Sequence, residues 1–230
     1  MQIESFDYVE GARAARGVAV IIDVFRAFSV ACYGVAAGAA RVVPVGEVEE
    51  ALRLRSTLPG SLAIGERYGR KLDGFDCGNS PTELRAFDLR GRTLVHTTHA
   101  GTQGLVAARA ADVVLTGALV NAGAICRYIR RLAPPQVSLV RMGVAAHDRS
   151  DADDLCAELL TARLTGESFP DTAQIRARLR GSREAQKFFD PEATWAPEQD
   201  FEACTDLDRF DFVLQLDGAD GFLKRLHVPV

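Results

Sequence analysis

The 230-residue sequence has few cysteines and no paired cysteine motif. There are five, Cys32, Cys77, Cys126, Cys156 and Cys204, an odd number at wide spacings without a C-x-x-C pair. This pattern argues against a disulfide framework or a zinc knuckle and favours a reducing compartment. The N-terminus also lacks a basic stretch followed by an apolar one, which argues against a signal peptide. We therefore expect a cytoplasmic protein.

Long apolar runs and a surplus of basic residues are absent too. The longest apolar run, residues 18–22, is far shorter than the ~20 residues of a membrane-spanning helix. The 27 Lys and Arg are outnumbered by 31 Asp and Glu, so the net charge is −4, and no clustered basic face marks a nucleic-acid partner. We expect no membrane or nucleic-acid partner, and the sequence is compatible with a homo-oligomer.

Several common catalytic fingerprints are missing. The sequence contains no Walker A motif, no G-x-G-x-x-G, no G-x-S-x-G and no H-E-x-x-H, and these are the usual signatures of P-loop, dinucleotide-binding, serine-hydrolase and zinc-protease sites. A candidate site must therefore be sought from the order of strands and polar turns.

Two stretches of the chain share one order of elements: strand, polar turn, Ala-rich helix, strand, Gly turn and helix. They cover about 17–86 and 91–165. The first opens with a β-branched run, typical of a strand covered on both faces of a parallel sheet. We expect an α/β fold of duplicated three-layer α/β/α units with largely parallel sheets. Residues 1–230 then form one domain with a C-terminal extension, 166–230, in which 210–216 is expected to be a closing strand.

The most distinctive stretch is 65–84, GERYGRKLDGFDCGNSPTEL. Recurrent glycines and charges of both signs predict a loop, and long loops in compact domains are usually functional or disordered. Apolar anchors argue against disorder. Ser80, Pro81 and Glu83 predict a helix start with Ser80 as N-cap. We interpret the stretch as the wall of a ligand site; the alternative is a rigid, salt-bridged surface loop.

Polar turns follow the predicted strands, where parallel sheets bind ligands. Asp23 directly follows a buried strand and is a candidate Mg²⁺ ligand, or else a turn-capping residue. Arg26 offers the planar fork that binds phosphate or sulfonate, and Glu66 offers a second carboxylate. The turns after 23, 65, 96 and 142 are expected to converge.

Residues 96–102, HTTHAGT, combine hydroxyls, imidazoles and free backbone N–H groups at a helix start. This is the chemistry of an anion cradle, although His96 alone also fits a satisfied core histidine. Further on, Asp154 and Glu158 lie one helical turn apart. They are expected either to contribute to the site or to lie on a solvated helix with an acidic N-terminus.

Four motifs, IIDVFRAFS, GERYGRKLDGFDCGNSPTEL, TLVHTTHAGTQG and DADDLCAELL, resemble those of the 2-phosphosulfolactate phosphatase (ComB) family. The resemblance implies a duplicated α/β/α fold and a small polyanionic phosphate ester as substrate. It also implies Mg²⁺-dependent hydrolysis of 2-phospho-3-sulfolactate to 3-sulfolactate and phosphate, a step of coenzyme M biosynthesis.

The resemblance also implies site residues. The catalytic set is Asp23, Arg26, Glu66 and Lys71. The substrate-binding set is Arg67, Asn79, Ser80, Thr97, Thr98, Gly101 and Thr102. The metal-binding set is Asp23, Glu66 and Asp76.

The nucleophile stays open between a water molecule and a side chain such as Asp23 or Cys77. Phe28 and His99 depart from the residues usual in the family, and both are expected near the pocket. A phosphatase for another small phosphorylated hydroxy acid is therefore an alternative, as is a non-catalytic anion-binding protein.

Overall fold

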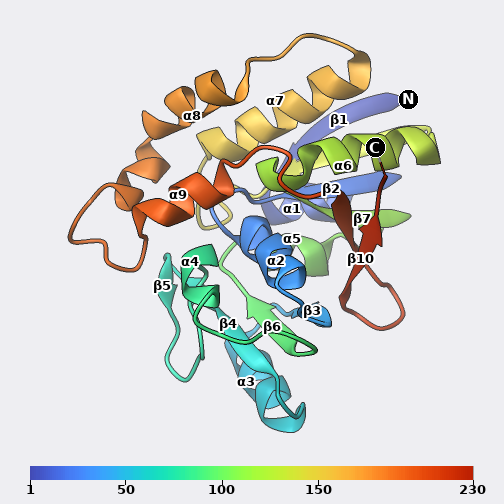
Figure 1. The fold of residues 1–230 in the computed structure, drawn as a ribbon. Coiled ribbons are helices and arrows are strands. Elements are labelled where there is room, and N and C mark those ends of the chain that lie inside the picture. The colour runs from blue at the N-terminus through green and yellow to red at the C-terminus, as the bar shows by residue number, and fades with distance from the viewer. Residues whose placement is uncertain (230) are drawn as a thin grey trace.

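The computed structural model describes residues 1–229 and builds them around one mixed sheet (Figure 1). The strand order is β1-β8-β2-β7-β9-β10-β3-β6-β4-β5. The strands are β1 (Gln2–Asp7), β2 (Val18–Ile22), β3 (Arg41–Pro44), β4 (Leu62–Arg67), β5 (Arg70–Lys71), β6 (Thr93–Thr97), β7 (Val113–Gly117), β8 (Gln136–Arg141), β9 (Phe212–Leu216) and β10 (Leu223–His227).

Helices cover both faces of this sheet. They are α1 (Tyr8–Ala14), α2 (Ala27–Ala36), α3 (Val48–Thr57), α4 (Pro81–Leu84), α5 (Gly101–Ala107), η1 (Leu119–Asn121), α6 (Ala122–Leu132), α7 (Asp151–Thr165), α8 (Thr172–Arg180), η2 (Arg183–Phe188) and α9 (Glu198–Cys204). Side chains alternate between the faces because the strand period is two. Ile21 packs toward α1, α2 and α5, whereas Val20 packs toward α6 and α7. The predicted three-layer α/β/α class with a mostly parallel sheet is confirmed.

The strands of the two sequence repeats are interleaved in space. β2 opens the first repeat but lies between β7 and β8 of the second, in parallel with both. β6 opens the second repeat but lies between β3 and β4 of the first, again in parallel. Each half of the sheet therefore contains strands from both repeats.

The C-terminal extension lies at the centre of the sheet. β9 pairs antiparallel with β7 and with β10, and β10 pairs antiparallel with β3. The strand predicted at 210–216 is therefore confirmed as β9, but it does not close the sheet at an edge, because β9 has neighbours on both sides. Phe212 and Val213 are buried on opposite faces of the sheet, so this hairpin joins the two halves.

The glycine-rich stretch is more regular than predicted. β4 continues to Arg67, a tight turn follows, and β5 pairs back onto β4. The predicted helix start is confirmed: Ser80 Oγ accepts a hydrogen bond from the Glu83 N–H at 3.1 Å, with Pro81 at the first turn of α4. None of the helices within residues 1–229 is both long and apolar enough to cross a membrane.

Gly65 lies where β4 approaches β6 most closely. Its φ is +155°, and a Cβ atom there would lie 2.0 Å from the Thr97 carbonyl oxygen. We expect Gly65→Ala to lower the free energy of unfolding by about 3 kcal/mol, because rigid backbone must move to relieve the overlap.

The matched control for this variant is Gly60→Ala. Gly60 also has positive φ, +72°, but no atom lies within 4 Å of the added Cβ, so about 1 kcal/mol of backbone strain is expected. Urea denaturation measures both. Equal losses in the two variants would show that the contact with Thr97 carries no cost.

Candidate active site

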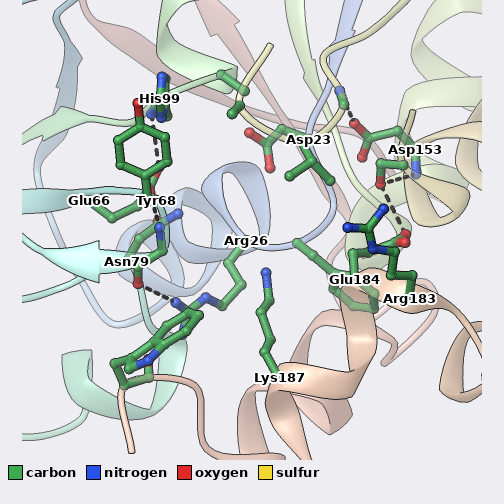
Figure 2. A pocket seen from close by; sticks show the side chains of 18 residues that line it. Asp23, Arg26, Glu66, Tyr68, Asn79, His99, Asp153, Arg183, Glu184 and Lys187 are labelled. Carbon is green, nitrogen blue, oxygen red and sulfur yellow. Dashed lines mark hydrogen bonds between the residues drawn. The ribbon is translucent and has the colours of Figure 1, made fainter. Parts of the chain in front are cut away.

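A cavity of about 350 Å³ opens at the carboxyl ends of two pairs of parallel strands, β2 with β8 and β4 with β6 (Figure 2). It is lined by Asp23 after β2, Glu66 at the end of β4, His99 after β6 and Gly143 after β8. The structure thus brings together the four turns whose convergence the sequence predicted. The volume suits a small molecule.

Asp23 is held as a hydrogen-bond acceptor by two helix starts. Its Oδ1 accepts from the Ala27 N–H of α2 at 3.2 Å, and its Oδ2 accepts from the Gly101 N–H of α5 at 2.9 Å. Burial raises the pKa of Asp23 to about 6, and the charge of Glu66 acts in the same direction. Neutralisation by a cation would favour the charged form of this carboxylate.

Glu66 is fixed in the same way from the other half of the sheet. Its Oε1 accepts from the His99 N–H at 2.8 Å and its Oε2 from the Gly69 N–H at 2.6 Å. The two contacts join the β4–β5 turn to the turn after β6. Glu66 is 8% exposed, so its carboxylate faces the cavity rather than bulk solvent.

A third carboxylate, Asp153, lies at the first turn of α7. Its Oδ1 accepts from the Val24 N–H at 2.9 Å, and its Oδ2 accepts from the Gly143 N–H at 2.8 Å. Burial, together with the nearby charge of Asp23, raises the pKa of Asp153 well above its usual range. The pocket therefore concentrates negative charge, which a bound cation would offset.

Arg26 lines the cavity but its charge has a partner. Nη1 donates to Asp200 Oδ2 at 2.6 Å and to the Trp195 carbonyl at 3.0 Å, and Nη2 donates to the Gly69 carbonyl at 3.1 Å. The side chains of Arg26 and Asp200 are 2% and 0% exposed. Arg26 therefore ties three segments together at the base of the pocket.

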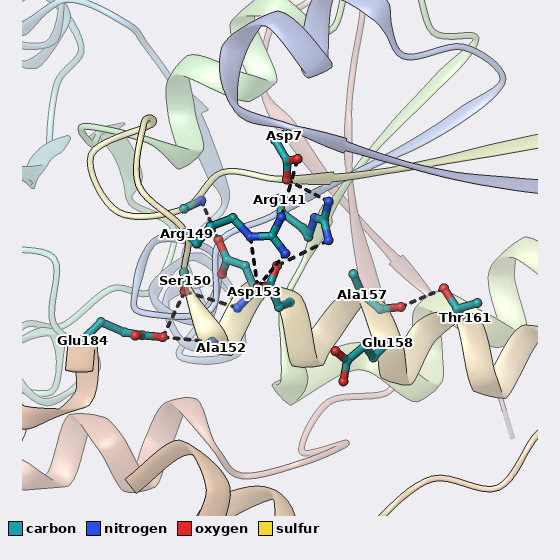
Figure 3. Close-up of polar contacts among 12 residues, drawn as sticks. Asp7, Arg141, Arg149, Ser150, Ala152, Asp153, Ala157, Glu158, Thr161 and Glu184 are labelled. Carbon is teal, nitrogen blue, oxygen red and sulfur yellow. Dashed lines mark hydrogen bonds and ion pairs between the residues drawn. The ribbon is translucent and has the colours of Figure 1, made fainter. Parts of the chain in front are cut away.

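Of the three cations that line the cavity, Arg183 and Lys187 have no carboxylate partner among residues 1–229, and they lie four residues apart on η2. Glu184 anchors this helix: its Oε1 accepts from Ser150 Oγ at 3.2 Å and from the Ala152 N–H at 2.9 Å (Figure 3). This contact with the N-terminus of α7 sets η2 against the pocket. Both cations are placed to bind an anionic ligand.

Asn79 lines the pocket and is supported from the core. His96 is buried, and its Nε2 lies 3.2 Å from Asn79 Oδ1. Burial lowers the pKa of His96 to about 3, so the ring stays neutral and can donate one hydrogen bond. His96 is thus a satisfied core histidine that orients a pocket residue.

Five other residues of the predicted substrate-binding set serve the architecture. Arg67 donates to the Gly46 carbonyl and to Thr97 Oγ1, and Ser80 Oγ donates to Asp200 Oδ1. Thr98 and Thr102 bond each other inside the turn. The remaining member of the set, Gly101, contributes its N–H to Asp23. Residues 96–102 therefore shape the site through backbone groups.

Lys71 and Asp76 are not pocket residues. Lys71 is exposed on β5. Asp76 Oδ2 accepts from Arg55 Nε at 2.6 Å and from the Ala63 N–H at 2.9 Å. The Arg55 hydrogen bonds lower the pKa of Asp76. Neither residue lines the cavity. Lys71 is exposed to solvent, and Asp76 is held outside the cavity by Arg55 and the Ala63 N–H.

For Asp154 and Glu158 the structure agrees with the second alternative, a solvated helix with an acidic N-terminus. Asp154 pairs with Arg149 at 2.8 Å and Glu158 pairs with Arg178 at 2.9 Å, both outside the pocket. Asp153 is the member that faces it. The sequence contains one indication of this. Ser150 is the N-cap of α7 and its Oγ accepts from the Asp153 N–H, which places Asp153 in the first turn of the helix.

Phe28 is fully buried in the core and does not line the cavity, whereas His99 does. Only His99, of these two positions, can influence a ligand directly. The His99 ring packs edge-on against Tyr68 with centroids 4.5 Å apart. The family departure at His99 therefore falls in the site and the one at Phe28 does not.

The carboxylates predicted to bind Mg²⁺ differ in whether they could do so. Within residues 1–229, no group of three or more His, Cys, Asp or Glu side chains forms a ready metal site. Mg²⁺ needs less, because it binds through one or two carboxylates and keeps several waters. In both Asp23 and Glu66, each carboxylate oxygen accepts one N–H. A carboxylate has about four acceptor positions, so each oxygen can still bind a cation. Asp23 and Glu66 fit such an ion; Asp76 does not.

A cavity of this size at strand ends, lined by carboxylates and cations, is typical of a binding site for a small molecule in an α/β protein. A sequence model described as 2-phosphosulpholactate phosphatase matches residues 6–219. The chain therefore belongs to the 2-phosphosulfolactate phosphatase family, a family of phosphoric monoester hydrolases.

Relatives named probable 2-phosphosulfolactate phosphatase support this membership. The Bacillus subtilis protein is 31% identical over 204 residues, covering 88% of each chain. The Thermotoga petrophila protein is 34% identical over 204 residues, 85% of this chain and 87% of the relative. A shorter match, 38% identical over 133 residues, links it to the Carboxydothermus hydrogenoformans protein, with 57% of this chain and 55% of the relative covered.

Proposed function

We propose that this protein hydrolyses 2-phospho-3-sulfolactate to 3-sulfolactate and phosphate with the help of Mg²⁺. The observation that carries the proposal is family membership over residues 6–219. The cavity agrees with it, because a polyanionic ester needs cations and the pocket offers Arg183 and Lys187. The step would belong to coenzyme M biosynthesis. The five cysteines are all free and buried, in keeping with a cytoplasmic location.

The chain's own groups divide the work of such a reaction. Asp23 and Glu66 would hold Mg²⁺, which when bound neutralises charge on the phosphate oxygens. Arg183 and Lys187 bind the anionic groups of the ester, and Asn79 offers a neutral contact. Phosphoryl transfer depends mostly on positioning and on charge stabilisation. The backbone N–H groups that donate to Asp23 and Glu66 hold these two carboxylates in fixed positions.

A substrate and metal panel tests the proposal. We expect phosphate release from 2-phosphosulfolactate to stop on chelation with EDTA and to return with Mg²⁺. We also expect slower release from 2-phospholactate and 2-phosphoglycolate, which lack the sulfonate. A preference for the unsulfonated esters would retain the chemistry and reject this substrate. Release from no ester at any Mg²⁺ concentration would favour a non-catalytic anion-binding protein.

A further inference from the structure

We propose that Lys187 is the general acid of the hydrolysis and donates a proton to the ester oxygen as the alcohol leaves. This inference rests on the proposed function, since it assigns a role within that reaction. Figure 2 shows the ammonium group of Lys187 directed into the cavity beside Arg26. Among residues 1–229, Lys187 forms no ion pair or hydrogen bond, and its ammonium group lies 5.1 Å from the centroid of the Phe188 ring, which accepts none of its protons in a conventional hydrogen bond. Its protons are therefore free for a ligand.

Most of the other charged side chains of the pocket are less suited to this role. Arg26 and Arg183 retain their protons at any ordinary pH. Asp23 and Glu66 are the carboxylates proposed to hold the cation, which requires their charged form, and Glu184 accepts from Ser150 Oγ and the Ala152 N–H. Asp153, whose pKa is raised well above its usual range by burial, is the one carboxyl group of the pocket that stays a candidate proton donor.

The uncharged side chains of the pocket that could donate a proton are Tyr68, Ser150 and His99. Tyr68 lies at the rim with 77% of its surface exposed, and Ser150 Oγ donates to Glu184. His99 lines the cavity, but its Nδ1 is buried without a partner and its ring is packed against Tyr68. The candidates among the described residues are therefore Lys187, His99 and Asp153. Asp153 is held by the Val24 and Gly143 N–H groups, whereas Lys187 lines the cavity without a hydrogen-bond partner in residues 1–229.

The surroundings of Lys187 suit an acid that works near neutral pH. Burial lowers the pKa of Lys187 to about 8, and Arg26 acts in the same direction, while Glu66, Asp23 and Cys204 oppose it. An ordinary lysine has a pKa of about 10.4 and gives up its proton less readily. General acids are most effective when their pKa lies near the working pH.

In the proposed hydrolysis, one bond forms and one breaks at phosphorus. A water oxygen forms a bond to phosphorus, the bond from phosphorus to the ester oxygen breaks, and its electron pair stays on that oxygen. Lys187 gives this oxygen one proton, so the alcohol leaves neutral and the amine is left uncharged. The attacking water keeps its two protons on the product as dihydrogen phosphate. One of these protons returns through solvent to the amine.

The test compares Lys187→Arg, which keeps the charge but holds its proton, with Lys187→Met, which loses both. We expect Lys187→Arg to bind the product 3-sulfolactate within about threefold of wild type by calorimetry, while kcat falls at least ~100-fold. In wild type, kcat/KM should decline as pH rises through about 8, where the ammonium is lost. This decline and the solvent deuterium isotope effect should vanish in Lys187→Arg. Lys187→Met should also lose product affinity.

The control is His99→Gln, which should keep both the decline in kcat/KM near pH 8 and the isotope effect. Loss of both in His99→Gln, with both retained in Lys187→Arg, would assign the role to His99. A Lys187→Arg enzyme within a few-fold of the wild-type rate would reduce Lys187 to an anion-binding charge. If the wild-type protein released phosphate from no ester, the proposed function itself would be overturned. This measurement uses the wild-type protein alone, so it is distinct from a failure of the Lys187 proposal.

Discussion

Asp23→Asn should lower kcat for phosphate release on the order of 10³-fold while the protein stays folded. The carboxylate lies at the carboxyl end of a central strand, is 7% exposed, and is oriented by the N–H groups of two helices. Asparagine keeps the shape but loses the charge that would hold a cation. Burial already disfavours that charge, but asparagine has one acceptor oxygen for the two N–H groups, so we expect a thermal midpoint lower by a few degrees in a protein that stays folded. Phosphate release and circular dichroism measure the two effects.

Asp76→Asn is the matched control. Asp76 comes from the same glycine-rich stretch as Glu66 but is held by Arg55 outside the pocket. We expect its kcat to stay within about threefold of wild type. If Asp76→Asn were as inactive as Asp23→Asn, the proposal that Asp23 and Glu66, but not Asp76, hold a cation would have to be abandoned.

Asp200→Asn should destabilise the protein by about 3–5 kcal/mol, because it leaves the buried guanidinium of Arg26 without a counter-charge. Both side chains of this pair are buried, and Nη1 donates to Oδ2 at 2.6 Å. Asp200 Oδ1 also accepts from Ser80 Oγ at 2.9 Å and from the Thr82 N–H at 3.0 Å. The variant should therefore loosen α4 and α9 together, and urea denaturation measures the loss.

A double variant separates lost charge from lost packing. Arg26→Met combined with Asp200→Asn leaves no buried charge unpaired and keeps the acceptor for Ser80. We expect it to be more stable than Asp200→Asn alone, with a coupling energy measured by the double-mutant cycle. Asp88→Asn breaks an exposed pair with Arg90 and should leave the urea midpoint unchanged. A double variant no more stable than Asp200→Asn would contradict the unpaired-charge explanation.

Local patterns were sufficient to predict the sheet and one side of the pocket. Apolar runs ending in a polar residue placed Asp23 and Glu66 at strand ends, and within each half of the sheet parallel strands bring such ends to one edge. The antiparallel hairpin of β9 and β10, which joins the two halves, was not predicted. Arg26 and Asn79 followed from their motifs and line the same cavity. Ser80 was placed correctly as a helix N-cap because capping depends on neighbouring residues alone.

The cationic side of the pocket could not be predicted in this way. Arg183 and Lys187 lie on a short 3₁₀ helix with no motif, and they reach the site because Glu184 bonds the N-terminus of α7. Asp200 lies on a helix whose segment has few apolar residues, so no periodicity revealed it. These positions depend on contacts between segments far apart in the chain, which local pattern does not encode.

The exchange of opening strands between the repeats governs how the chain can acquire its structure. β2 is made early in synthesis, yet its two sheet neighbours, β7 and β8, belong to the second repeat. Pairings between segments so distant in sequence close large loops and slow folding. The first repeat alone has no partner for its opening strand. During synthesis this apolar strand therefore stays unpaired until the second repeat has been translated. The active site, shared between the two halves, is complete only once both have emerged.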